Sequence, residues 1–272
     1  MERNFFTDTL VLSSRIFGEN NRILTVLTPE KGIFDAILYG GRKSRLKSLA
    51  SPFHTGTMWF YNDESTHSVK ITDFDVKKFR PTLHENLYKS MAASFCSELL
   101  IKTRGGNEDS QYSVLWVLTN GFLDGLELTD EKGCELGLLR FIWRFLAIQG
   151  EQPDVESCCV CDSPFEADCA SGNYNGNSNE NMLSYVSYYD ESKQGFLCRD
   201  CSAGIQAASY RFPLSGEACN YLRAVNNLTP KEVRQILLHT ESVHQMHDVL
   251  MYLAEKCAGS KLYTLESGKG IL

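Results

Sequence analysis

The spacing of apolar residues divides the chain into two parts with different periods. Five short runs rich in β-branched and aromatic residues lie between residues 8 and 78, at 9–12 continuing into 15–17, 23–28, 33–39, 57–61 and 69–74. Glycine, proline, asparagine and serine separate the runs, which is typical of strands joined by turns. Five strands in a segment of this length predict a small OB-fold barrel. Another small barrel or a sandwich fits the strand count equally well.

Beyond Pro81 the period changes to that of a helix. Apolar residues recur every four positions, and the first predicted helix carries them at Leu87, Met91, Phe95 and Leu99. A second helix is predicted over residues 110–123 and a third over 130–149. The third is apolar on nearly every side, so it is expected to be a central buried helix.

Helical signals return near the end of the chain. Thr229-Pro230-Lys231-Glu232 combines a capping threonine, a proline at the first helical position and a glutamate that can bond back to the cap. A last helix is predicted over 243–257. The sequence therefore predicts an α+β protein, with a barrel domain at 1–80 and a helical domain at 81–272. A cysteine module is inserted in the helical domain at about 155–205.

Net charge differs between these two parts. The 272 residues carry a formal charge of −7, which taken whole argues against a nucleic-acid binder. Residues 1–80 hold 12 basic and 9 acidic residues, whereas residues 81–272 hold 15 basic and 25 acidic ones. The barrel is mildly cationic and the acid lies in the helical domain, so each part is expected to have its own partners.

Two cysteine pairs are the sharpest local motif. Cys158-x-x-Cys161 and Cys198-x-x-Cys201 supply four thiolates, which suit tetrahedral zinc. Four protein ligands leave no open coordination position, so one structural Zn²⁺ per chain is predicted. Between the pairs lies a polar Asn/Gly-rich insert at 171–181. The alternatives are thiols without metal, or a redox pair, which would sit at a strand-to-helix junction of a βαβ unit that the sequence does not show.

A basic segment follows the third predicted strand. Four cations lie within six residues, at Arg42, Lys43, Arg45 and Lys47, and no acid occurs from residue 36 through 62. Such cations can neutralise phosphates and release counterions, and the nearby Tyr39 can stack on a base. These five residues are the predicted DNA-binding set. The alternative is an ordinary solvated loop.

The sequence contains none of the phosphate-loop, nucleophile-elbow, zinc-protease or dinucleotide motifs. A protein that is not an enzyme is therefore predicted. The first residues lack the basic and apolar regions of a secretion signal, and no apolar run reaches the ~18 residues of a membrane span. A cytoplasmic protein is expected.

In this order, these features resemble the RecO family of bacterial DNA repair and recombination mediators. Residues 9–32 look like the opening strands of that family, and residues 39–45 look like its basic segment. The paired cysteines, and Gly259-Ser260-Lys261-Leu262 after the last helix, extend the likeness. The chain departs from the family in its long insert and in a single Gly195 where a glycine pair is expected.

The resemblance implies an OB-fold followed by a helical domain with a zinc module. It also implies binding of single- and double-stranded DNA and annealing of complementary strands. A nucleoid-associated member would act with RecR, and often with RecF, to load RecA onto DNA coated by single-strand-binding protein. Arg140 and Arg144, one turn apart on the third predicted helix, are the expected contacts for the acidic tail of that protein. The alternatives are a zinc-ribbon/OB-fold adaptor for nucleic acids and a cysteine-based redox enzyme.

Overall fold

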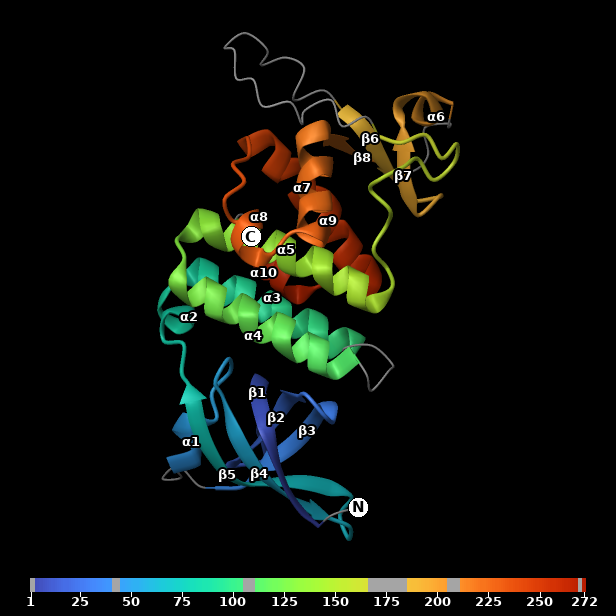
Figure 1. The fold of residues 1–272 in the computed structure, drawn as a ribbon. Helices are drawn as coiled ribbons and strands as arrows, with labels where there is room; N and C mark the ends of the chain where they lie inside the picture. The colour runs from blue at the N-terminus through green and yellow to red at the C-terminus, as the bar shows by residue number, and fades with distance from the viewer. Residues whose placement is uncertain (1–2, 41–44, 105–110, 166–184, 205–210, 269–270) are drawn as a thin grey trace. The chain divides into compact units, whose positions relative to one another are not determined.

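The structure is a computed structural model of the whole chain. It describes residues 3–40, 45–104, 111–165, 185–204, 211–268 and 271–272 (Figure 1). The chain forms two compact units, Met1–Phe141 with Glu255–Leu272, and Ile142–Ala254. The boundaries between the units fall inside two long helices, α5 (Glu131–Gln149) and α9 (Thr240–Ala258).

The first unit begins with a closed five-stranded barrel, drawn in blue to cyan in Figure 1. Its strands are β1 (Asn4–Phe17), β2 (Asn21–Thr28), β3 (Gly32–Leu38), β4 (Thr55–Asp63) and β5 (Ser68–Lys78). They close in the order β1-β2-β3-β5-β4, with all pairs antiparallel except β3 with β5. The five predicted strands and the OB-like barrel are confirmed.

Alternating side chains build the core of the barrel. Leu24 and Val26 of β2 and Met58 and Phe60 of β4 are buried in one cluster. Gly56 sits where β4 and β5 shift register, and a Cβ there would lie 2.0 Å from the backbone oxygen of Asp75. Only glycine permits that approach of the two backbones, which tightens the barrel at this point.

Helices follow the barrel. A short α1 (Arg45–Leu49) lies between β3 and β4 in the chain, and α2 (Thr82–Glu85), α3 (Leu87–Thr103) and α4 (Tyr112–Leu128) come after β5. The predicted first and second helices are confirmed, and the second continues five residues further than expected. Helix α5 confirms the prediction of a buried helix, since these of its side chains are buried: Leu138, Leu139, Phe141, Ile142, Trp143, Phe145 and Leu146. The short α10 (Tyr263–Ser267) also belongs to this unit.

The second unit contains a small sheet that the sequence patterns did not reveal. Its strands β6 (Tyr185–Asp190), β7 (Gly195–Cys198) and β8 (Arg211–Ser215) pair in the order β7-β6-β8, and all pairs are antiparallel. Helices α6 (Arg199–Ala203), α7 (Gly216–Asn227) and α8 (Pro230–Val233) accompany the sheet.

The predicted helix start at Thr229 is confirmed. Thr229 and Glu232 form a reciprocal capping box, but the helix that they start, α8, ends after four residues. The last predicted helix is confirmed as α9. Among the residues that the structure describes, no helix combines the length and apolar character needed to cross a membrane.

Arg80 joins the barrel to the helices within the first unit. Its side chain is 2% exposed, and its Nη1 donates to the Phe53 carbonyl oxygen at 2.6 Å and to Thr55 Oγ1 at 2.8 Å. On the helical side, Nη2 donates to Asn120 Oδ1 at 2.9 Å and Nε donates to Asp124 Oδ1 at 2.8 Å. The guanidinium therefore bonds the β4 end of the barrel to α4.

This arrangement bears on the predicted domain boundary at residue 80. The barrel strands end at Lys78, two residues before that boundary. The compact unit, however, runs through the barrel and helices α2 to α4 into α5. An independent barrel domain at 1–80 stays a prediction.

Replacing Arg80 with methionine should destabilise the protein by on the order of 3 kcal/mol, because it leaves buried acceptors without a donor. Denaturant unfolding followed by circular dichroism measures the loss. The matched control is Lys78→Met, which removes the 2.6 Å salt bridge to the same Asp124 at an exposed position. This control should cost less than about 1 kcal/mol. Equal losses for the two variants would contradict the assignment.

Candidate metal centre and nucleic-acid interface

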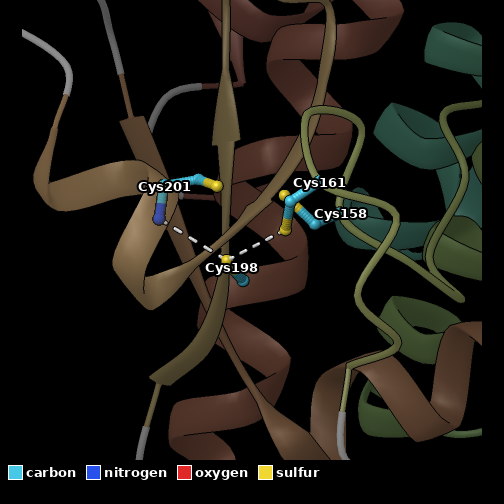
Figure 2. Close-up of side chains that lie close together, drawn as sticks. All are labelled: Cys158, Cys161, Cys198 and Cys201. Atoms are coloured by element: carbon cyan, nitrogen blue, oxygen red, sulfur yellow. Dashed lines mark hydrogen bonds between the residues drawn. The ribbon is translucent and has the colours of Figure 1, made fainter.

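The four predicted cysteines come together in the second unit, as Figure 2 shows. The sulfur atoms of Cys158, Cys161, Cys198 and Cys201 all lie within 4.8 Å of one another, and the Cys161 and Cys198 sulfurs are 3.8 Å apart. A tetrahedral zinc with bonds of about 2.3 Å separates its sulfurs by about 3.8 Å. The geometry of the cluster therefore fits a four-thiolate metal site.

A tight turn holds the first pair. The Asp162 N–H donates to the Cys158 carbonyl at 2.9 Å, and the Cys158 N–H donates to the Ser163 carbonyl at 2.9 Å. Asp162 adopts a left-handed φ of 56°, a conformation that aspartate tolerates better than most residues. The turn folds Cys161 back over Cys158, so both sulfurs face the same point.

A strand end and a helix start hold the second pair. Cys198 is the last residue of β7 and the N-cap of α6, where its sulfur accepts a hydrogen bond from the Cys201 N–H at 3.5 Å. This is a strand-to-helix junction, which sequence reasoning did not find. The sheet is antiparallel rather than part of a βαβ unit, and the junction faces a second cysteine pair, so the surroundings are not those of a thioredoxin-type site.

Hydrogen bonds at the cluster lower the pKa of two of its thiols, whereas those with Cys161 and Cys198 raise the pKa of Cys201 to about 12. Ser163 is the main cause that lowers the pKa of Cys161, to about 6. Backbone N–H groups outweigh the cost of burial at Cys158 and lower its pKa as well. Thiolate is the form that binds metal. At least part of the set is therefore prepared for a cation at neutral pH.

The single Gly195 has a packing role beside this cluster. A Cβ at Gly195 would lie 2.9 Å from the Cβ of Cys159 and 3.0 Å from its sulfur, so the neighbouring turn leaves no room for a side chain. The Cys159 N–H donates to the Phe196 carbonyl at 2.9 Å, which ties the first turn to β7. Cys159 itself is exposed and lies outside the four-sulfur cluster.

Of the predicted DNA-binding residues, the structure describes the backbone of Tyr39, Arg45 and Lys47. Tyr39 directly follows β3 and is 49% exposed. Arg45 begins α1 and Lys47 lies within it, a helix that the sequence patterns did not predict. Arg42 and Lys43, and the side chains of Arg45 and Lys47, lie outside the described residues.

Cations and aromatic rings alternate beside Tyr39. The Lys70 Nζ lies 5.5 Å from the centre of the Tyr39 ring and 5.9 Å from that of Tyr61, and the Arg3 guanidinium lies 5.6 Å from the Tyr61 ring. Asp63 accepts a 2.5 Å salt bridge from Lys70, which raises the pKa of this lysine. We call Arg3, Tyr61, Lys70 and Tyr39 the cation–aromatic row.

Sequence reasoning missed Lys70 and Arg3, because their neighbours depend on strand register. Tyr61 pairs with Lys70 across β4 and β5, and the Asn62 N–H bonds to the Arg3 carbonyl. Two of the aromatic residues near the basic segment, Phe53 and Phe60, are buried. They are therefore not available to stack on a base.

Arg140 and Arg144 lie one turn apart on α5, and both are partly buried. Arg144 Nη2 donates to the Val225 carbonyl at 3.3 Å. The spacing predicted from the sequence is present, and part of the hydrogen-bonding capacity of Arg144 is used inside the second unit.

Comparison with known proteins matches both halves of the chain. The family model described as "Recombination protein O N terminal" matches residues 1–79, and the model "Recombination protein O C terminal" matches residues 84–265. A DNA repair protein RecO from Bacillus pumilus is 24% identical over 257 residues, which cover 93% of this chain and 89% of that protein. A DNA repair protein RecO from Syntrophotalea carbinolica is 26% identical and covers 81% of this chain and 78% of its own length.

A third relative extends the similarity to nearly the full length. The DNA repair protein RecO of Bacillus velezensis is 24% identical over 97% of this chain and 95% of its own. The N-terminal model coincides with the barrel, and the C-terminal model includes the helices and the four-cysteine cluster. With both models matched in order, the chain belongs to the RecO family and has a role in DNA repair and recombination.

Proposed function

We propose that this chain is a recombination mediator that works without covalent catalysis. It binds single- and double-stranded DNA, anneals complementary strands and, with RecR, helps to load RecA onto DNA coated by single-strand-binding protein. RecF takes part in some of these loading reactions. The protein and its partners act on the nucleoid, in the cytoplasm. The cation–aromatic row, which includes Tyr39 and lies on a barrel of the family, carries the proposal.

The chemistry of annealing suits such a surface. Two polyanionic strands must be held close together while their repulsion is screened, and no covalent bond changes. Arg3 and the four cations of residues 42–47 supply positive charge on the barrel, while Lys70 lies beside the rings as an ion pair with Asp63. The exposed Tyr39 offers a face for an unpaired base. The acidic helical domain repels DNA, which leaves its surface available to protein partners.

The metal in this proposal is a structural Zn²⁺ held by Cys158, Cys161, Cys198 and Cys201. Bound there, it would cross-link the turn of the first cysteine pair to β7 and α6. A Zn²⁺ ion with four protein ligands activates no water, so its contribution is stability of the second unit.

The acidic tail of single-strand-binding protein is proposed to bind at Arg140 and Arg144. Both side chains belong to one face of α5, and this helix carries many apolar side chains. An acidic and apolar peptide needs a cation beside an apolar surface. Helix α5 supplies the two cations, and Leu136, one turn before Arg140, is only partly buried.

Reversing the charges of Arg42, Lys43, Arg45 and Lys47 to glutamate should weaken binding of a single-stranded oligonucleotide. It should also reduce the slope of log K against log salt by about 3, because each phosphate contact contributes about 0.7. Anisotropy titrations at several salt concentrations measure both effects, and annealing of strands coated with single-strand-binding protein should fall with them. The control reverses the exposed Lys193, Lys231, Arg234 and Lys261, which gives the same net charge. Identical losses in the two variants would refute the assignment.

Elemental analysis should find about one zinc and no iron in the purified chain, as expected for a four-thiolate site. Cys158→Ser should remove the metal and expose residues of about 150–205 to protease, because the fold of a small metal module depends on its ion. Cys159→Ser is the matched control, since its sulfur lies outside the cluster, and it should keep its zinc. A fully stable Cys158→Ser chain without metal would refute a structural zinc.

Arg140→Glu/Arg144→Glu should weaken binding of a peptide with the acidic tail sequence at least tenfold, because two cations become like charges. Binding of a single-stranded oligonucleotide should change less than twofold. Calorimetric titration of both ligands provides the comparison. If both ligands lose affinity equally, the two surfaces are not separate.

A further inference from the structure

A second surface of the barrel has a composition that DNA binding does not explain. It comprises Phe6, Trp59, Asp8, Asp73 and Asp75, and we call it the Phe6–Trp59 face. We propose that this face docks a segment of a partner protein that carries arginine or lysine beside an apolar side chain. The inference does not rest on the proposed function, since it concerns another part of the barrel and another class of ligand.

Two aromatic rings form the centre of the face. Phe6 and Trp59 are partners across β1 and β4, and their ring centres are 6.2 Å apart. Phe6 is 69% exposed and Trp59 is 37% exposed. Their sequence neighbours Phe5 and Phe60 also pair, with ring centres 5.0 Å apart, and this second pair packs with the core. The core of the barrel therefore already has its aromatic pair, and the outer pair is not needed to fill it.

Carboxylates surround the exposed rings. Asp73 pairs with Trp59 across β4 and β5, and Asp75 pairs with Thr57 one step along the same strands. On the other side, Asp8 pairs with Thr57 across β1 and β4. All three aspartates are exposed. Lys77 neutralises one of them through a 3.2 Å salt bridge to Asp8, so the face keeps a net negative charge.

The charge selects the kind of partner. Asp73 and Asp75 repel phosphates, so electrostatic repulsion would weaken the binding of a nucleic acid that stacked on Trp59. A guanidinium or ammonium group is attracted by the same carboxylates and can also lie over an aromatic ring. Exposed apolar area rimmed by polar groups is typical of interaction sites. A basic and apolar peptide therefore matches both the rings and their rim.

Selection of a random heptapeptide display library on the immobilised full chain tests the proposal. Peptides with arginine or lysine next to leucine, phenylalanine or tryptophan should be enriched. A synthetic copy of an enriched peptide should bind at least tenfold more weakly to Phe6→Ser/Trp59→Ser and to Asp73→Lys/Asp75→Lys. The second variant keeps both rings, so it still tests the face if the first folds poorly. Ile16→Ser is the matched control, because Ile16 is an exposed apolar residue of β1 outside the face.

Three results would overturn the proposal. In the first, the library yields no enrichment of peptides that combine a basic with an apolar residue. In the second, an enriched peptide binds Asp73→Lys/Asp75→Lys as tightly as it binds the unaltered chain. In the third, an oligothymidylate of twenty nucleotides quenches the fluorescence of Trp59 and binds Phe6→Ser/Trp59→Ser more weakly than the unaltered chain. That result would make the face a nucleic-acid surface. If charge reversal at residues 42–47 does not affect DNA binding, the proposed function fails but none of these three outcomes changes. The two proposals can therefore be tested independently.

Discussion

The buried guanidinium of Arg80 is the constraint on which the architecture of the first unit depends. Removing a charge from water costs several kcal/mol, and only a nearly complete set of acceptors offsets that cost. The acceptors come from both sides, with Phe53 and Thr55 on the barrel side and Asn120 and Asp124 on α4. The guanidinium is therefore satisfied only when the barrel and α4 are docked. Any ligand surface of the barrel therefore belongs to a compact unit that also contains α4.

Local patterns predicted the five strands and the helices α3, α4 and α5, but neither the short α1 nor the bonds between the elements of this unit. The barrel strands are apolar runs bounded by turn residues, so they are visible in the sequence, and α5 is apolar on nearly every side. Arg80 lies 40 residues before Asn120 and 44 before Asp124, and no local pattern connects residues at such separations. A positive φ at Arg80 adds a conformation that sequence reasoning would assign to glycine or asparagine.

The candidate metal centre likewise has a part that the sequence predicted and a part that it did not. The four cysteines were predictable because two short Cys-x-x-Cys spacings produce two local turns that each present two sulfurs. The sheet that positions the second pair was not, because β6, β7 and β8 have only six, four and five residues. Strands this short contain too few alternations to show a period, and β8 includes Pro213, which weakens the signal further. Tertiary pairing with neighbouring strands decides their conformation.

The net charge of the barrel conceals two neighbouring surfaces of different charge. Residues 1–80 are mildly cationic as a whole. The pairing of β4 with β5, however, places Lys70 opposite Tyr61 and two aspartates opposite Trp59 and Thr57. One strand pair thus presents Tyr61 beside the Lys70–Asp63 ion pair and, two residues away on β4, Trp59 beside carboxylates. Because side chains two apart on a strand share a face, this change from an ion pair to carboxylates occurs within a few residues. The register of β4 against β5 thus determines which charged groups lie beside each ring.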